Sequence, residues 1–318
     1  MFDQSGNQIS IPLPPDEEGY TGRECPKCRS YFKIVFGTSL KGTTHCYCPH
    51  CGYKGNFSGF HTQAQIEYVQ SVGANYVSAQ IINMFKSLET ELRSRPRQRG
   101  GLFTVDFDIK VTGQPTPIRY YWEPKLETKV TCSNCTLQYA IYGVYAFCPD
   151  CGQHNSQQIL ENNLDIAQKM LALAEDAEGD MVVTLIGNSL GSVVAAFDGF
   201  GRKVCRVFAD KTSDPTKAAG IRFQNLTGAQ TNVQQHFGFD IASPLTATEW
   251  EDANRCFQKR HLLAHNNGVI DDDYIAKAND PKAVKGRKVS ITPDEIVSLI
   301  DIIRKLGAYI MAEMKKLP

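Results

Sequence analysis

The chain has 318 residues, of which 42% are hydrophobic, and its 34 Lys and Arg balance its 34 Asp and Glu. This apolar fraction excludes a wholly disordered chain, and the neutral charge excludes a generally basic nucleic-acid binder of the histone kind. The length predicts about two domains. We expect a cytoplasmic protein without a membrane span, because no run reaches roughly 18 apolar residues and the polar, Pro-rich start does not resemble a secretory signal.

Nine of the 11 cysteines fall into two clusters, and each cluster contains two C-x-x-C pairs. In a reducing compartment such pairs predict zinc sites, because each tight turn aims two thiolates at one point and two turns complete a tetrahedral shell. Four thiolates leave no open coordination position, so both zinc ions are expected to be structural and not catalytic. The expected ligands are Cys25, Cys28, Cys48 and Cys51 in the first ribbon, and Cys132, Cys135, Cys148 and Cys151 in the second.

Two alternatives stay open for these cysteines. Cys46 lies two residues before Cys48 and can replace it as a ligand. A redox-active C-x-x-C pair is the other interpretation, although the duplication of the pairs has no redox rationale. Cys205 and Cys256 stand alone in apolar surroundings, where we expect core residues.

The domain organisation follows from shifts in pattern along the chain. We expect an α+β fold that combines two zinc ribbons, built from short antiparallel strands, with a C-terminal four-helix bundle. Apolar spacing predicts a helix over residues 62–92, and strict alternation predicts a strand over 102–111 that a Pro-rich turn continues into a hairpin. The expected parts are a flexible tail (1–19), zinc ribbon 1 (20–60), a helix and basic linker (61–100), a β hairpin and zinc ribbon 2 (101–157), and the bundle (158–318).

Helical periodicity dominates the C-terminal half. Residues 157–177 and 189–210 predict two helices, and two capping boxes open the others, Thr246 with Glu249 and Thr292 with Glu295. Residues 211–245 show no clear period, and we expect a long loop there.

The third of these helices ends in the sequence Arg260-His261-Leu-Leu-Ala-His265, and the second contains AAFDGFGRK, with Asp198 between aromatic residues. This R-x4-H motif near the end of a third bundle helix, together with the acidic and aromatic second helix, resembles the HEPN family over residues 158–318. The resemblance implies a metal-independent endoribonuclease that acts as a homodimer, with the Arg and His of both copies in one cleft. It also implies catalytic positions for Arg260 and His265, a variable polar position for His261, and supporting positions for Asn266 and Asp198.

The residue types suit this chemistry on their own account. Cleavage of RNA by its own 2′-hydroxyl requires proton transfer near neutral pH, which imidazoles provide, and charge stabilisation at phosphorus, which a guanidinium provides. The expected products carry a 2′,3′-cyclic phosphate and a 5′-hydroxyl. Many members of the family act as toxins or in defence against phage, and we extend that expectation to this chain.

Simpler interpretations compete with the ribonuclease. Cations at a helix C-terminus are commonly a solvated end, and the bundle can serve dimerisation alone. The rival function is a zinc-ribbon adaptor that binds nucleic acid or a protein partner, with a catalytically silent bundle. The G-x-S-x-G sequence at 187–191 resembles a hydrolase nucleophile elbow, but we expect a turn into a helix there. We expect a solvated turn at Asp271–Asp273 and a phosphate-binding or solvated role for two basic runs, Arg93–Arg99 and Lys277–Lys288.

Overall fold

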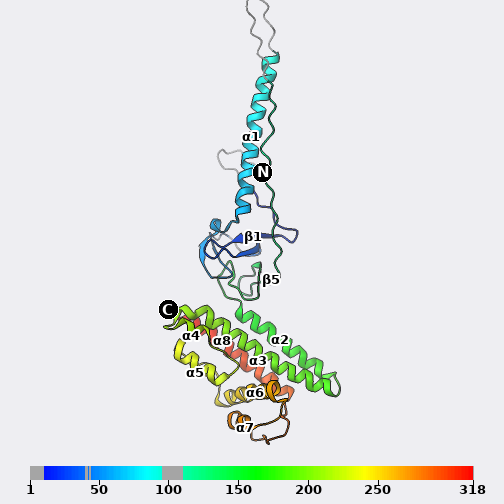
Figure 1. Ribbon diagram of the computed structural model, residues 1–318, viewed down its shortest axis with the longest axis vertical. Helices are drawn as coiled ribbons and strands as arrows, with labels where there is room; N and C mark the ends of the chain where they lie inside the picture. The colour runs from blue at the N-terminus through cyan, green and yellow to red at the C-terminus, as the bar shows by residue number, and fades with distance from the viewer. Residues whose placement is uncertain (1–10, 40–41, 43, 95–109, 318) are drawn as a thin grey trace, which may run out of the picture. The chain divides into compact units, whose positions relative to one another are not determined.

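The computed structural model describes residues 11–39, 42, 44–94 and 110–317, and the chain divides into two compact units, Met1–Gln153 and His154–Pro318 (Figure 1). The expected strand at 102–111 and three arginines of the first basic run lie almost wholly outside the described residues. The second unit starts four residues before the expected boundary at 158.

One antiparallel sheet in the first unit unites the two zinc ribbons. Its order is β1-β2-β6-β5, so each ribbon contributes one hairpin and the hairpins meet where β2 pairs with β6. The two expected ribbons therefore share one sheet. The strands are β1 (Tyr20–Glu24), β2 (Tyr31–Val35), β5 (Thr128–Thr131) and β6 (Gln138–Ile141), with a separate β3 (His45–Tyr47) and β4 (Lys54–Asn56) pair in the first ribbon.

The two ribbons repeat each other in detail. Gly52 and Gly152, which follow the last cysteine of each ribbon, have φ values of 69° and 70°. The backbone N–H of Tyr47 donates to the carbonyl of Pro149 at 2.8 Å, and Phe147 donates to Pro49 at the same distance. Each ribbon thus closes on the other through an equivalent bond, so the two ribbons form an internal repeat.

Helix α1 (Gln63–Ser94) confirms the helix expected over 62–92. Of the hairpin expected after it, the structure describes only the part from residue 110 onward. Residues 110–127 contain no strand and run back along α1 (Figure 1). Backbone N–H groups of this segment donate to helix side chains, Thr116 to Ser78 Oγ and Arg119 to Ser71 Oγ, both at 2.9 Å. The helix satisfies backbone groups that the expected hairpin would have paired with a second strand.

The start of the described chain is tied to the sheet. The Asp16 carboxylate accepts the backbone N–H of Tyr20 at 2.8 Å and pairs with Lys33 Nζ at 2.7 Å, and the Lys33 side chain is buried. The expected flexible tail over 1–19 is therefore anchored from Asp16 onward.

The second unit is helical, and its four longest helices pack around one apolar core. They are α2 (Ser156–Glu175), α3 (Asp180–Phe208), α6 (Ala247–Asn266) and α8 (Pro293–Lys316). Both capping boxes form as predicted, with Thr246 and Thr292 each accepting the N–H of the glutamate three residues later. Cys205 and Cys256 lie in this core as expected.

The stretch expected to be a long loop contains two helices, α4 (Pro215–Ala219) and α5 (Leu226–Phe237), after a short 3-10 turn, Ala209–Lys211. Residues between α4 and α5 pack directly on α3, since a Cβ on Gly201 would sit 2.4 Å from the Phe223 ring. The absence of a side chain at Gly201 thus lets the second helix accept this insertion.

Helix α3 begins nine residues earlier than expected, at Asp180. The 187–191 sequence lies inside it, and Ser189 Oγ is buried and donates to the Ala167 carbonyl at 2.8 Å. A serine nucleophile at this position is therefore excluded. Among the described residues, the stretch Asp180–Lys211 alone is long and apolar enough to cross a membrane, and its buried side chains face the bundle core.

Candidate functional site

Two cysteine clusters match the predicted zinc ligands. In each cluster the four Sγ atoms lie within 4.8 Å of one another. The first cluster is Cys25, Cys28, Cys48 and Cys51, and the second is Cys132, Cys135, Cys148 and Cys151. The shortest Sγ–Sγ distances between the two C-x-x-C pairs of each cluster are 3.4 to 3.8 Å. A tetrahedral zinc with Zn–S bonds of about 2.3 Å requires sulfurs about 3.8 Å apart, so the geometry fits.

The chemistry of the donors fits zinc as well. Burial raises the pKa of the Cys48 and Cys148 thiols, so thiolates there require a cation to balance their charge. Cys46 lies outside the cluster, since it is buried on β3 with its Sγ 3.5 Å from the Tyr47 carbonyl. Cys48 is therefore the better ligand of the two.

The predicted catalytic residues occupy the last two turns of α6. His261 and His265 are exposed, one turn apart, with ring centroids separated by 4.6 Å and planes inclined by 48°. Arg260 is half-buried, and its guanidinium forms no hydrogen bond or ion pair with any residue that the structure describes. Arg260 and His265 lie about 140° apart around the helix axis, because they are five positions apart at 3.6 residues per turn.

The other two predicted residues have structural partners. Asn266 donates to the Val269 carbonyl at 2.7 Å, in the turn where Asn267 and Gly268 adopt positive φ and end α6. The buried Asp198 accepts the backbone N–H of Phe223 at 2.7 Å and pairs with Arg202 at 3.6 Å. These bonds hold the connection between α4 and α5 against α3, so the partners that the structure shows for Asp198 are structural.

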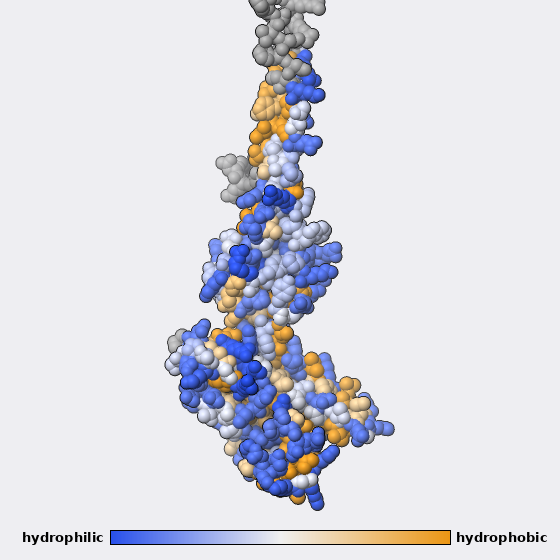
Figure 2. Space-filling view, in the orientation of Figure 1, coloured by the Kyte–Doolittle hydropathy of each residue, from blue (hydrophilic) through white to orange (hydrophobic). Residues whose placement is uncertain are grey.

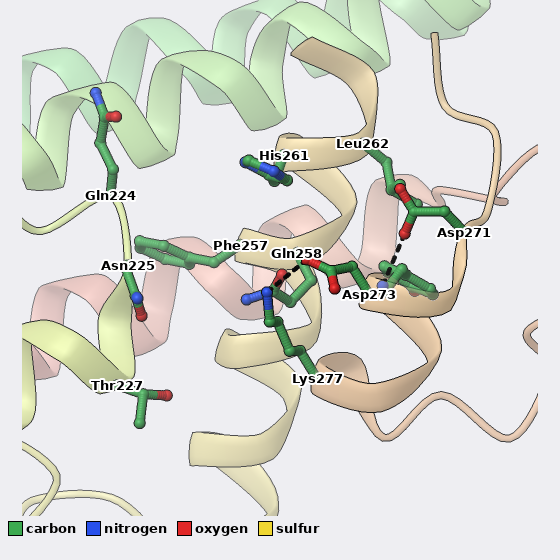
Figure 3. A pocket seen from close by; sticks show the side chains of 11 residues that line it. Gln224, Asn225, Thr227, Phe257, Gln258, His261, Leu262, Asp271, Asp273 and Lys277 are labelled. Carbon is green, nitrogen blue, oxygen red and sulfur yellow. Dashed lines mark hydrogen bonds and ion pairs between the residues drawn. The ribbon is translucent and has the colours of Figure 1, made fainter. Parts of the chain in front are cut away.

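A pocket of about 480 Å³ lies beside His261 (Figure 3). Residues at the start of α5 form one side, and α6 and α7 (Asp272–Ala278) form the other. His261 is the one predicted site residue that lines it. The remaining lining residues are Gln224, Asn225, Thr227, Phe257, Gln258, Leu262, Asp271, Asp273, Tyr274 and Lys277.

The polar groups of this pocket are only partly used within the chain. Asn225 Oδ1 caps α5, and the Gln224 amide donates to Asp198 at 3.4 Å, while the Gln258 amide has no hydrogen bond among the described residues. Lys277 pairs with Asp273 at 2.7 Å, and this bond lowers the pKa of the Asp273 carboxyl. Several amide donors and acceptors therefore stay available to a ligand.

Sequence reasoning missed this pocket. Its α5 side falls in the stretch expected to be a loop, and its α7 side begins at the aspartates expected to be a solvated turn. Asp271 instead caps α7 by accepting the N–H of Tyr274, and Asp272 pairs with Lys285 at 2.5 Å. The signal that could have revealed α7 is this aspartate directly before the helical residues, at the N-cap position.

Few of the lysines and arginines in the two basic runs form ion pairs among the described residues. Lys277 and Lys285 form ion pairs with aspartates. Lys282, Arg287 and Lys288 are exposed. In the first run Arg93 pairs with Glu89 at 2.8 Å, and the other arginines lie outside the described residues.

Compared with protein-family models, with curated proteins and with solved structures, the chain shows no significant match. The resemblance to HEPN proteins therefore rests on the residues of α3 and α6.

Proposed function

We propose that the chain is a metal-independent endoribonuclease of the HEPN type, with Arg260, His261 and His265 as its catalytic groups. The observation that carries the proposal is the exposed imidazole pair at the end of α6, beside a pocket and next to an unpaired guanidinium. Solvated helix ends do not require two adjacent imidazoles or a neighbouring cavity. A role as a toxin or in phage defence belongs to the same proposal.

The reaction needs only groups that the chain supplies. One imidazole takes the proton of the ribose 2′-hydroxyl, whose oxygen attacks the adjacent phosphorus and forms a cyclic phosphodiester. A second imidazole gives its proton to the departing 5′-oxygen. The Arg260 guanidinium stabilises the charge that accumulates on the non-bridging oxygens.

A homodimer is part of this mechanism. Within one chain Arg260 and His265 point to different sides of α6, so one phosphate does not reach both from a single face. Two copies related by symmetry can bring the Arg260 of one chain to the His265 of the other.

The pocket beside His261 suits one nucleotide of the substrate. The amides of Gln224, Asn225 and Gln258 offer donors and acceptors of the kind that read base edges in single-stranded RNA. Their uncharged character favours a base over a phosphate, which leaves the phosphate for Arg260.

The test is cleavage of a fluorescent single-stranded RNA by zinc-loaded protein in buffer without free divalent cations. We avoid strong chelators because they would also remove the structural zinc. Arg260→Ala and His265→Ala should each lower the rate at least about 100-fold. His236→Ala on α5 and Arg206→Ala on α3 are matched controls on other helices, and they should leave the rate unchanged. Rates unchanged in both α6 variants would remove the site.

A second function, the nucleic-acid adaptor, is favoured by a different observation. Trp122 is 93% exposed and Tyr120 is 75% exposed, on the segment that runs along α1, with Arg119 nearby. Exposed aromatic side chains next to a cation can stack on the bases of single strands. If Trp122→Ala weakens RNA binding while no variant or wild type cleaves RNA, the adaptor is the better account.

A further inference from the structure

Helix α1 carries a continuous apolar stripe on its surface. Six large members of this stripe are each 45–56% exposed, and Figure 2 shows the hydrophobic band along the helix. The α1 stripe consists of Ala74, Val77, Ile81, Met84, Phe85, Leu88 and Leu92. Such a patch on an isolated helix marks an interaction site.

The unit's own described chain does not cover this stripe. The segment 110–127 contacts α1 through Ser71, Ser78 and Glu89, which lie on a different face of the helix. A helical wheel places that face about 80° from the centre of the stripe.

The spacing of the stripe selects a helical partner. Ala74, Val77, Ile81, Met84 and Leu88 follow the alternating steps of three and four residues that define the a and d positions of a coiled coil. Phe85 and Leu92 widen the stripe at e positions, as in helices that pack in bundles.

The charge pattern excludes two other classes of partner. Residues 68–85 contain no Asp, Glu, Lys or Arg. A nucleic acid would need cations for its phosphates, and a helix that lies on a membrane would carry Lys and Arg on its polar face. Depletion of charge is instead characteristic of the centre of a protein interface.

We propose that the α1 stripe is the interface with a second copy of this chain, paired as an antiparallel coiled coil. In the antiparallel register Ile81 faces Met84 of the second copy and Val77 faces Leu88, so apolar side chains meet on both sides of the two-fold axis. Glu91, the one charged residue at a d position, then faces Ala74. A parallel pair would place the two Glu91 carboxylates against each other.

The area is sufficient for a specific dimer. Six large side chains, each about half exposed, offer on the order of 500 Å² of apolar surface per helix, so a symmetrical pair buries on the order of 1,000 Å² before its polar flanks are counted. The pairing is independent of the ribonuclease proposal, because it lies on α1 and not on the bundle.

Sedimentation of the full-length protein tests the interface. We compare wild type with Ile81→Glu/Met84→Glu and with a control, Asn83→Glu/Thr90→Glu, which adds the same charge on the opposite, exposed side of α1. At tens of micromolar, the stripe variant should associate at least about tenfold more weakly than wild type, because only the contact between the bundles is left to join two copies. The control should sediment as wild type. A monomeric wild type, or a stripe variant that associates as strongly as wild type, would overturn the proposal.

Folding and orientation are checked in parallel. All variants should retain their zinc and helix content, which separates lost pairing from misfolding. With the photoreactive amino acid p-benzoylphenylalanine at Val77, irradiation should join the tryptic peptide 55–86 to the peptide 87–93, which contains Leu88. These two positions lie about 16 Å apart along one helix, so the cross-link must come from the second copy. A cross-link from position 77 to residues 73–81 of the second copy, which a parallel pair would place opposite it, would overturn the antiparallel arrangement.

Discussion

His154 begins the second unit with a buried imidazole. Its Nδ1 accepts the backbone N–H of Ser156 at 3.1 Å, at the start of α2. Burial lowers the pKa of His154 to about 3, and the charge of Lys203 acts in the same direction. The His154 side chain is therefore neutral in the folded protein at neutral and mildly acidic pH.

This environment predicts an acid-sensitive step in stability. The unfolded chain binds a proton at His154 below about pH 6.5, whereas the folded chain does not until about pH 3. The free energy of unfolding is therefore unaffected by His154 above pH 6.5 and decreases as the pH falls below it. Between pH 7 and 5 the wild type should lose about 2 kcal/mol more free energy of unfolding than His154→Asn, whose amide oxygen keeps the acceptor. Urea titrations at both pH values measure this, and equal losses in the two proteins would refute it.

Some properties of single residues could be predicted from the sequence, and others could not. The spacing of Arg260 and His265 could be noted from the sequence, and so could the helix that carries them. The role of Asp198 could not, because its partner, the N–H of Phe223, lies 25 residues further on in a stretch without periodicity. The placement of His261 and Gln224 around one pocket depends on the same packing.

At the level of elements, the sequence predicted those that carry their own local signals. The thiolate pairs, the capping boxes and the long apolar periods of α1, α2 and α8 are such signals. Helix α5 was missed because its apolar positions, among them Leu226 and Val233, are few and separated by polar residues. The pairing of β2 with β6 joins residues about a hundred positions apart, and no local pattern encodes that.

The first ribbon provides a prediction that separates neighbouring cysteines. Cys46 has its pKa raised to about 12 by burial and lies outside the thiolate cluster, while Cys48 lies within it. Purified Cys46→Ala should contain two zinc ions per chain, whereas Cys48→Ala should contain about one, because three thiolates hold the metal less well. Elemental analysis by mass spectrometry measures the ratio. Zinc lost from the Cys46 variant and kept by the Cys48 variant would reverse the assignment.

For the whole molecule, the two units have separate tasks in this account. The first contains two ribbons that share a sheet and whose cysteines can hold metal ions, and the α1 stripe that we propose pairs two copies. The second contains the imidazole pair, the guanidinium and the pocket. A dimer held by α1 would raise the effective concentration of two bundles for each other, which favours a cleft shared between copies.

The chemical nature of the cleaved ends tests the ribonuclease proposal most directly. Zinc-loaded wild type is incubated with an RNA of defined sequence, without free divalent cations, and the fragments are identified by mass spectrometry. Attack by the neighbouring 2′-hydroxyl predicts a 2′,3′-cyclic phosphate on the upstream fragment and a 5′-hydroxyl on the downstream one. Fragments that end in a 3′-hydroxyl and a 5′-phosphate, or RNA that stays intact, would contradict it.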